Sequence, residues 1–90
     1  MRCGPITLTY RKALEAAYPS YARCHDFYKW AMEHCDKYDT ETRRNMGEQY
    51  AIMHAELRGQ IAFMARVFPL DEHTIRCDLE LMYEDRHRED

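Results

Sequence analysis

Glycine and proline are scarce in this chain, with three residues of each among ninety. So few turn-forming residues exclude a β-rich fold. Long apolar runs are also missing. No stretch approaches the roughly 20 apolar residues of a membrane span, and no apolar run of signal-peptide length follows Met1. We therefore expect a cytoplasmic protein with no membrane partner, in which the four cysteines are reduced thiols.

Strong charge is absent too, because the net charge is only −3. A field this weak would not attract nucleic acid. The doublet Arg43-Arg44 is the only basic pair in the predicted helices, and no short glycine turn joins two helices as in a helix-turn-helix. There is no glycine-rich phosphate loop and no nucleophile elbow. We expect neither an enzyme nor a nucleic-acid partner, and no cofactor.

The first half of the chain does contain an unbroken heptad pattern of mostly apolar side chains, which we call the heptad seam. Alternating steps of three and four residues place such side chains on one side of a helix, along its whole length. The pattern predicts a first helix, from about residue 7 or 9 to about residue 38, that packs against another helix throughout. The heptad seam consists of Thr7, Tyr10, Leu14, Ala17, Tyr21, Cys24, Tyr28, Ala31, Cys35 and Tyr38.

Pro19 interrupts this predicted helix, and proline inside a helix costs about 3 kcal/mol. The heptad spacing nevertheless continues through Pro19, which lies on the side away from the seam. The pattern is compatible with a kinked continuous helix or with two nearly collinear helices that meet at Tyr18-Pro19.

Two more helices are predicted. Asp39 or Thr40 can cap a second helix that runs to about Val67, where a proline follows closely. Asp71 can cap a short third helix, and the charged tail of residues 84–90 is expected to fray. The predicted fold is an all-α single domain over the whole chain. Its two long helices form an antiparallel hairpin, joined by the short C-terminal helix.

The second helix has a face of small residues beside its face of large ones. Glycine within a helix costs about 1 kcal/mol relative to alanine, so we expect another backbone to come close to this face. The small residues are Gly47, Ala51, Ala55, Gly59 and Ala62.

The short third helix cannot cover two long helices, so part of the heptad seam would stay exposed. We therefore expect a homodimer or larger homo-oligomer that completes a helical bundle. The packing residues would be the small face of the second helix and the seam residues Tyr21, Cys24, Tyr28, Ala31 and Cys35. The alternative is a monomer in which the first helix breaks at Pro19 and folds back into a four-helix bundle.

A candidate partner-binding surface lies opposite the heptad seam. Arg23, Phe27, Trp30 and His34 follow one another at steps of four, three and four. An aromatic pair flanked by arginine and histidine has the composition of an interface hot spot. The alternative is that the third helix buries Phe27 and Trp30 in an ordinary core.

A second candidate site borders the small-residue face of the second helix. Arg44, Arg58 and Arg66 could receive a nucleotide or another anion there. Glu48 and Glu56 lie close enough to neutralise much of their field, so we rank this site lower.

Metal binding ranks third. His73 and Cys77 have the spacing of a helical ligand pair, but there is no CxxC pair and no evident set of further ligands. We expect no metal site. The chain reads best as a small protein that binds another protein as an inhibitor, adaptor or regulatory subunit. A phage- or plasmid-encoded inhibitor of a host enzyme or defence complex fits this description, on base rates alone.

Overall fold

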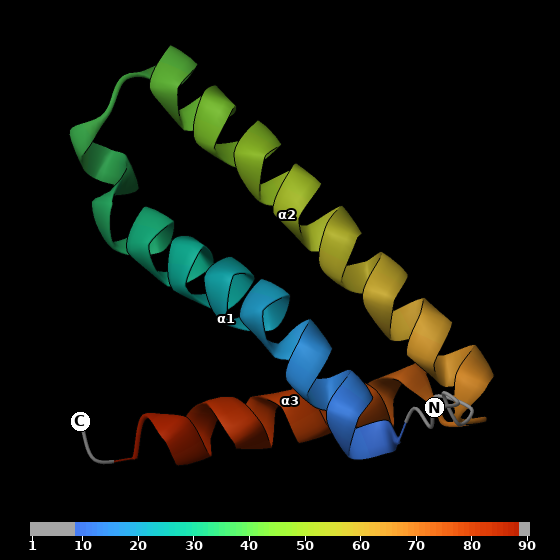
Figure 1. Ribbon diagram of the computed structural model, residues 1–90. Helices are drawn as coiled ribbons and strands as arrows, with labels where there is room; N and C mark the ends of the chain where they lie inside the picture. Colours follow the sequence, from blue (N-terminus) through green and yellow to red (C-terminus); the bar gives the residue numbers. More distant parts are fainter. Residues whose placement is uncertain (1–8, 89–90) are drawn as a thin grey trace, which may run out of the picture.

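The computed structural model describes residues 9–88, and these form three α-helices (Figure 1). Helix α1 spans Tyr10–His34, and a short 3-10 turn, η1, follows at Cys35–Lys37. Helix α2 spans Thr40–Val67 and α3 spans Glu72–Arg86. There is no strand within the described residues, so the all-α prediction is confirmed. None of these helices has the length and apolar character needed to cross a membrane.

Each α-helix begins at a side-chain cap. The Thr9 hydroxyl accepts a hydrogen bond from the backbone N–H of Lys12 at 3.1 Å, and the Asp39 carboxylate accepts one from Thr42 at 2.8 Å. Asp71 caps α3 in the same way. These bonds satisfy N–H groups that have no partner within the helix. The predicted caps at Asp39 and Asp71 are confirmed.

Pro19 lies inside α1, which continues through it as one helix. The alternative in which the first helix breaks there and folds back is therefore wrong. Tyr18 before the proline and Ser20 after it are both buried, as is Cys24 one turn further. Packing on both sides of Pro19 holds the helix together despite the missing backbone hydrogen bond.

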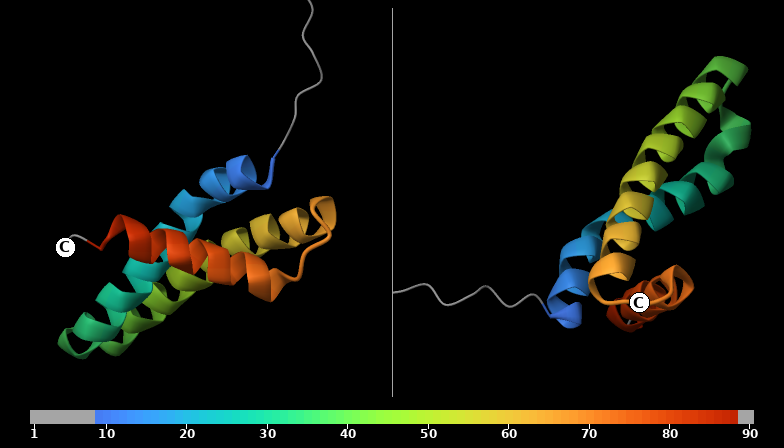
Figure 2. Two further views of the ribbon diagram at one scale, coloured as in Figure 1. Left: turned by 90° about the horizontal axis from the view of Figure 1, so that it is seen from below. Right: turned by 90° about the vertical axis from the view of Figure 1, so that its right-hand side faces the viewer.

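The three helices form a two-helix hairpin and a third helix that lies across it. Helices α1 and α2 run antiparallel, and α3 lies across the open end of their hairpin, in contact with both (Figures 1 and 2). The core lies at this crossing, where Ile61, Ile75 and Leu79 are completely buried. The other buried apolar residues are Ala13, Leu14, Ala17, Tyr18, Cys24, Leu57 and Met64.

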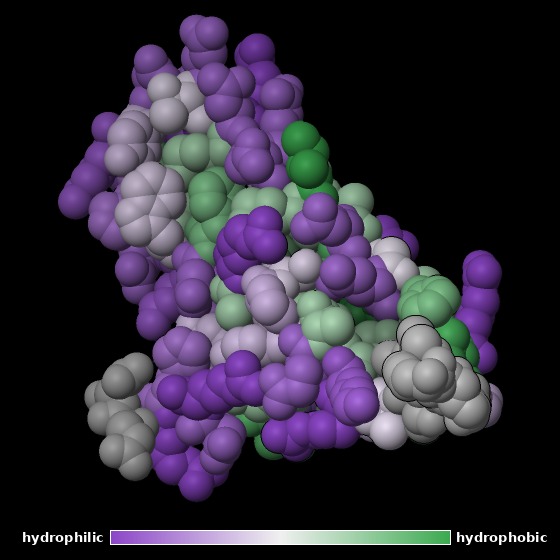
Figure 3. All heavy atoms as spheres, in the orientation of Figure 1, coloured by the Kyte–Doolittle hydropathy of each residue, from purple (hydrophilic) through white to green (hydrophobic). Residues whose placement is uncertain are grey.

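The other end of the hairpin extends beyond α3 and has no core. None of residues 25–56 is buried, and we call this segment the distal hairpin. Apolar atoms are visible at the surface between α1 and α2 at this end (Figure 3). The prediction that the heptad seam packs along its whole length is wrong. Leu14, Ala17 and Cys24 are in the core, whereas Tyr28 and Tyr38 are exposed; Thr7 lies outside the described residues.

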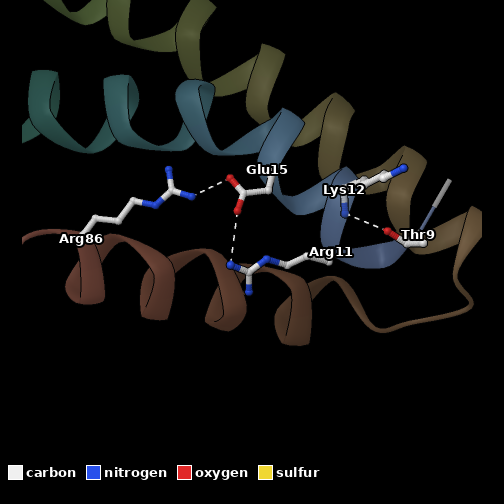
Figure 4. Close-up of polar contacts among 5 residues, drawn as sticks. All are labelled: Thr9, Arg11, Lys12, Glu15 and Arg86. Carbon is white, nitrogen blue, oxygen red and sulfur yellow. Dashed lines mark hydrogen bonds and ion pairs between the residues drawn. The ribbon is translucent and has the colours of Figure 1, made fainter.

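The charged C-terminal segment is more ordered than predicted. Residues 84–86 belong to α3, so the expected fraying from residue 84 is wrong for them. The Arg86 guanidinium donates to Glu15 at 2.6 Å and lies 4.3 Å above the ring of Tyr18. The Glu15 carboxylate therefore joins α1 to α3. It also pairs with Arg11 of α1 at 3.3 Å (Figure 4).

Candidate binding surface on the distal hairpin

An aromatic cluster covers the outer flank of α1 in the distal hairpin. The Trp30 ring stacks on His34, with ring centroids 5.0 Å apart, and contacts Phe27 and Tyr38 at 6.3 and 5.9 Å. Trp30 is 41% exposed because α3 packs at the opposite end of the hairpin. The alternative in which α3 buries Phe27 and Trp30 is therefore wrong, and Arg23 is exposed as well.

Tyr38 is a member of this cluster that the sequence pattern did not identify. Counting heptads placed it in the seam, on the other side of a helix. In the structure α1 ends at His34, and Tyr38 follows η1 in an extended conformation. The heptad rule holds only while the helix continues, so the change of backbone direction brings Tyr38 to Trp30.

On the opposite flank of α1, a pocket of about 730 Å³ borders α3 at Arg76. Cys24 and Leu57 are its buried residues, and the rings of Tyr21, Tyr28 and Tyr50 line it with them. Burial raises the pKa of Tyr21 and also that of Tyr50. The remaining lining residues are His25, Lys29, Met32, Glu33, His54 and Arg76.

A smaller pocket of about 210 Å³ continues toward the loop end of the hairpin. It shares Tyr28, Met32 and Tyr50 with the larger pocket, so the two adjoin. We call them together the distal groove. On α1 the groove extends from Tyr21 to Cys35, about 21 Å at 1.5 Å per residue. The other residues of the smaller pocket are Phe27, Ala31, Arg43, Met46 and Gly47.

The small-residue face of α2 is exposed, although Gly47 borders the smaller pocket and Gly59 borders a pocket that Ala13, Ala16 and Ala17 of α1 also line. Gly47, Ala51, Ala55 and Gly59 are all exposed. A Cβ atom added at either glycine would meet no atom within 4 Å. Within the described residues, neither α1 nor α3 makes the close backbone approach expected at these glycines, and the approach of a second subunit stays a prediction.

The three arginines of the candidate anion site are exposed and spread along α2. Arg44 lies about 21 Å from Arg58 along the helix axis, and Arg58 lies about 12 Å from Arg66, at 1.5 Å per residue. A single phosphate cannot contact all three. The structure thus keeps these side chains on separate parts of the helix.

The cysteines occupy different environments. Cys24 is buried, and this burial raises the pKa of its thiol. Cys35, at the loop end of the heptad seam, is only partly buried; Cys3 lies outside the described residues. The Sγ atom of Cys77 lies 3.5 Å from Nε2 of His73. Across residues 9–88, no three histidine, cysteine, aspartate or glutamate side chains gather in a way that could hold a metal ion.

The distal hairpin therefore presents two apolar surfaces, an aromatic cluster around Trp30 and a groove between α1 and α2, and Phe27 belongs to both. In comparisons with known proteins, no family model, no curated protein and no solved structure matches this chain.

Proposed function

We propose that this protein is a binding module, working as an adaptor, inhibitor or regulatory subunit, whose distal hairpin is covered by a protein partner. One observation carries the proposal: none of residues 25–56 is buried, although the segment is rich in large apolar side chains. Tyr28 and Met32 are 51% and 60% exposed, and Trp30 is 41% exposed. Covering such side chains contributes about 25 cal/mol for each Å² of apolar surface removed from water.

The composition of this surface supports a protein partner. Tryptophan, tyrosine and arginine are the residues that most often dominate binding energy at protein interfaces. Trp30, Phe27 and His34 form a preassembled stack next to Arg23, which reduces the ordering cost of binding. Self-association is a further proposal, since a symmetric contact between two copies can cover one patch on each of them.

The proposal is tested with binders selected on the wild-type chain from a displayed library of helical peptides. Each binder should lose at least about thirtyfold in affinity with Tyr28→Ala, with Trp30→Ala, or with both. Leu81→Ala is the matched control, because Leu81 is 61% exposed on α3, outside the distal hairpin. Binders that depend on Leu81, or on none of the three residues, would contradict the proposal.

A second measurement separates binding from folding. If Trp30 belongs to a surface, wild-type tryptophan emission should be at the long wavelength of a hydrated indole, and Trp30→Ala should change the melting temperature little. A core tryptophan would instead cost about 3–5 kcal/mol of stability on truncation. Short-wavelength emission together with a collapsed variant would place Trp30 in a core and remove it from the binding surface.

A further inference from the structure

We propose that the distal groove binds an amphipathic helix that carries carboxylates beside its apolar anchor residues. This inference rests on the proposed function and specifies the chemistry of the partner. It follows from the shape of the groove, from the way α3 packs beside it and from the charges along its rim.

The groove has the dimensions of a helix-binding site. It lies between two antiparallel helices and extends for about 21 Å, the length of a helix of about 14 residues. Its walls are mainly apolar and aromatic, which suits the apolar face of a helix inserted at intervals of three or four residues. The deepest part is at Cys24 and Leu57, where one large apolar side chain could be anchored.

Helix α3 shows how such an occupant would pack. It buries Ile75 and Leu79 completely against the same hairpin, at the end where the core lies. Arg76 of α3 lines the proximal end of the groove, so the groove begins beside α3. A partner helix would cover the uncovered part of the hairpin as α3 covers the other part.

The rim of the groove carries an excess of positive charge. Lys29 and Arg76 line the larger pocket and Arg43 lines the smaller one, whereas Glu33 is the single carboxylate of either lining. None of these three cations takes part in an ion pair within residues 9–88. Since the whole chain has a net charge of −3, this local excess is not a general property of its surface.

These charges distinguish a foreign helix from a second copy of this chain. In a symmetric groove-to-groove dimer the cation-rich lining of one copy would face the same lining of the other copy. Placing like charges opposite one another is unfavourable, whereas carboxylates on a partner helix would pair with them. The complementary occupant is therefore an acidic amphipathic helix.

The test uses two synthetic 14-residue helical peptides with identical leucine anchors. One carries glutamate at the positions that flank the anchors, and the other carries lysine there. Fluorescence anisotropy of the labelled peptides gives their affinities for the full chain. We expect the glutamate peptide to bind at least tenfold more tightly at low salt, and the preference to shrink at high salt because ions screen exposed charges.

Charge-reversed variants assign the preference to the groove. Lys29→Glu with Arg76→Glu should reverse it, and the neutral pair Lys29→Gln with Arg76→Gln should abolish it. The control is Arg58→Glu with Arg66→Glu, which makes the same change in net charge at exposed positions outside the groove lining. This control should keep the preference, and circular dichroism checks that each variant is folded.

Other outcomes are distinguishable. Equal affinity for the two peptides, lost in Tyr28→Ala, would overturn the charge inference and leave the proposed function standing. An equal loss of preference in the control variant would also overturn it, because the effect would then come from net charge. If neither peptide binds the groove, the result contradicts both this inference and the proposed function on which it rests. Self-association that blocks the peptides would place a second copy in the groove and overturn the inference.

Discussion

At the scale of single residues, two tyrosine–aspartate pairs attach α3 to α1. The Tyr10 hydroxyl donates a hydrogen bond to Asp78 at 2.5 Å, and the Tyr83 hydroxyl donates one to Asp26. Burial, and then the bond to Asp78, raises the pKa of Tyr10. The bond to Asp26 raises the pKa of Tyr83 to about 12 and lowers the pKa of Asp26. Tyr83 also lies between the rings of His25 and His87.

The Tyr83 pair predicts a loss of stability at alkaline pH. Because its pKa is higher in the folded chain than the ordinary value of 10.0, its contribution is complete below pH 10 and is lost as the pH rises toward 12. Tyr83→Phe keeps the stacked ring and removes the hydroxyl. It should cost about 1 kcal/mol at pH 7 and flatten the decline between pH 10 and 12, as measured by urea unfolding.

Tyr38→Phe is the control for this experiment, because the Tyr38 hydroxyl makes no hydrogen bond to any described side chain or backbone group. It should leave both the stability at pH 7 and its alkaline decline unchanged. Equal behaviour of the two variants would show that the bond to Asp26 contributes nothing to stability.

At the scale of elements, one face of α2 packs in the core and another face is exposed. Leu57, Ile61 and Met64 join the core. Gly47 and Gly59, on the small-residue face, have no atom within 4 Å of a Cβ built on them, although both border pockets beside α1. Glycine is a poor helix former because it loses more backbone freedom than other residues on folding. The two glycines therefore lower the stability of α2 without a compensating close contact among residues 9–88.

Gly59→Ala should consequently stabilise the protein. Without an atom within 4 Å of the added Cβ, the substitution brings only the higher helix propensity of alanine, about 0.5–1 kcal/mol. Urea unfolding measures the gain, and light scattering before and after the substitution measures the mass in solution. A loss of stability together with a fall in mass would mean that the backbone of a second copy packs against Gly59.

At the scale of the whole molecule, stability is unevenly distributed. The chain is elongated, with extents of 57 × 30 × 30 Å, and its buried residues are confined to the end that α3 crosses. A hairpin of two helices without a third layer buries little apolar surface. The distal hairpin therefore depends on the core for its position.

This asymmetry predicts a gradient of amide hydrogen exchange along α2. Amides of residues 57–64 should exchange only through global unfolding, and amides of residues 43–54 should exchange faster through local opening. Adding the glutamate peptide should slow exchange in residues 43–54 and leave residues 57–64 almost unchanged. Uniform protection along α2 in the free protein would contradict the unequal distribution of stability.

Local interactions explain what could be predicted from the sequence. Asp39 and Asp71 cap helices through bonds to residues two or three positions away, and the heptad spacing describes one helix at a time. These features depend only on near neighbours in the chain, so the three helices and much of their bounds were predictable. The same spacing correctly separated the flank of Trp30 from the flank of Tyr28.

Only the tertiary structure decided which apolar residues are buried. Leu14 and Tyr28 are equivalent in the heptad pattern, yet Leu14 is in the core and Tyr28 is 51% exposed, because α3 covers one and stops short of the other. The position of α3 depends on pairs such as Arg86 with Glu15, which are 71 residues apart in the chain. The distal groove likewise needs residues of all three helices. No local sequence pattern encodes contacts between residues so far apart in the chain, since these contacts follow from how the helices pack together.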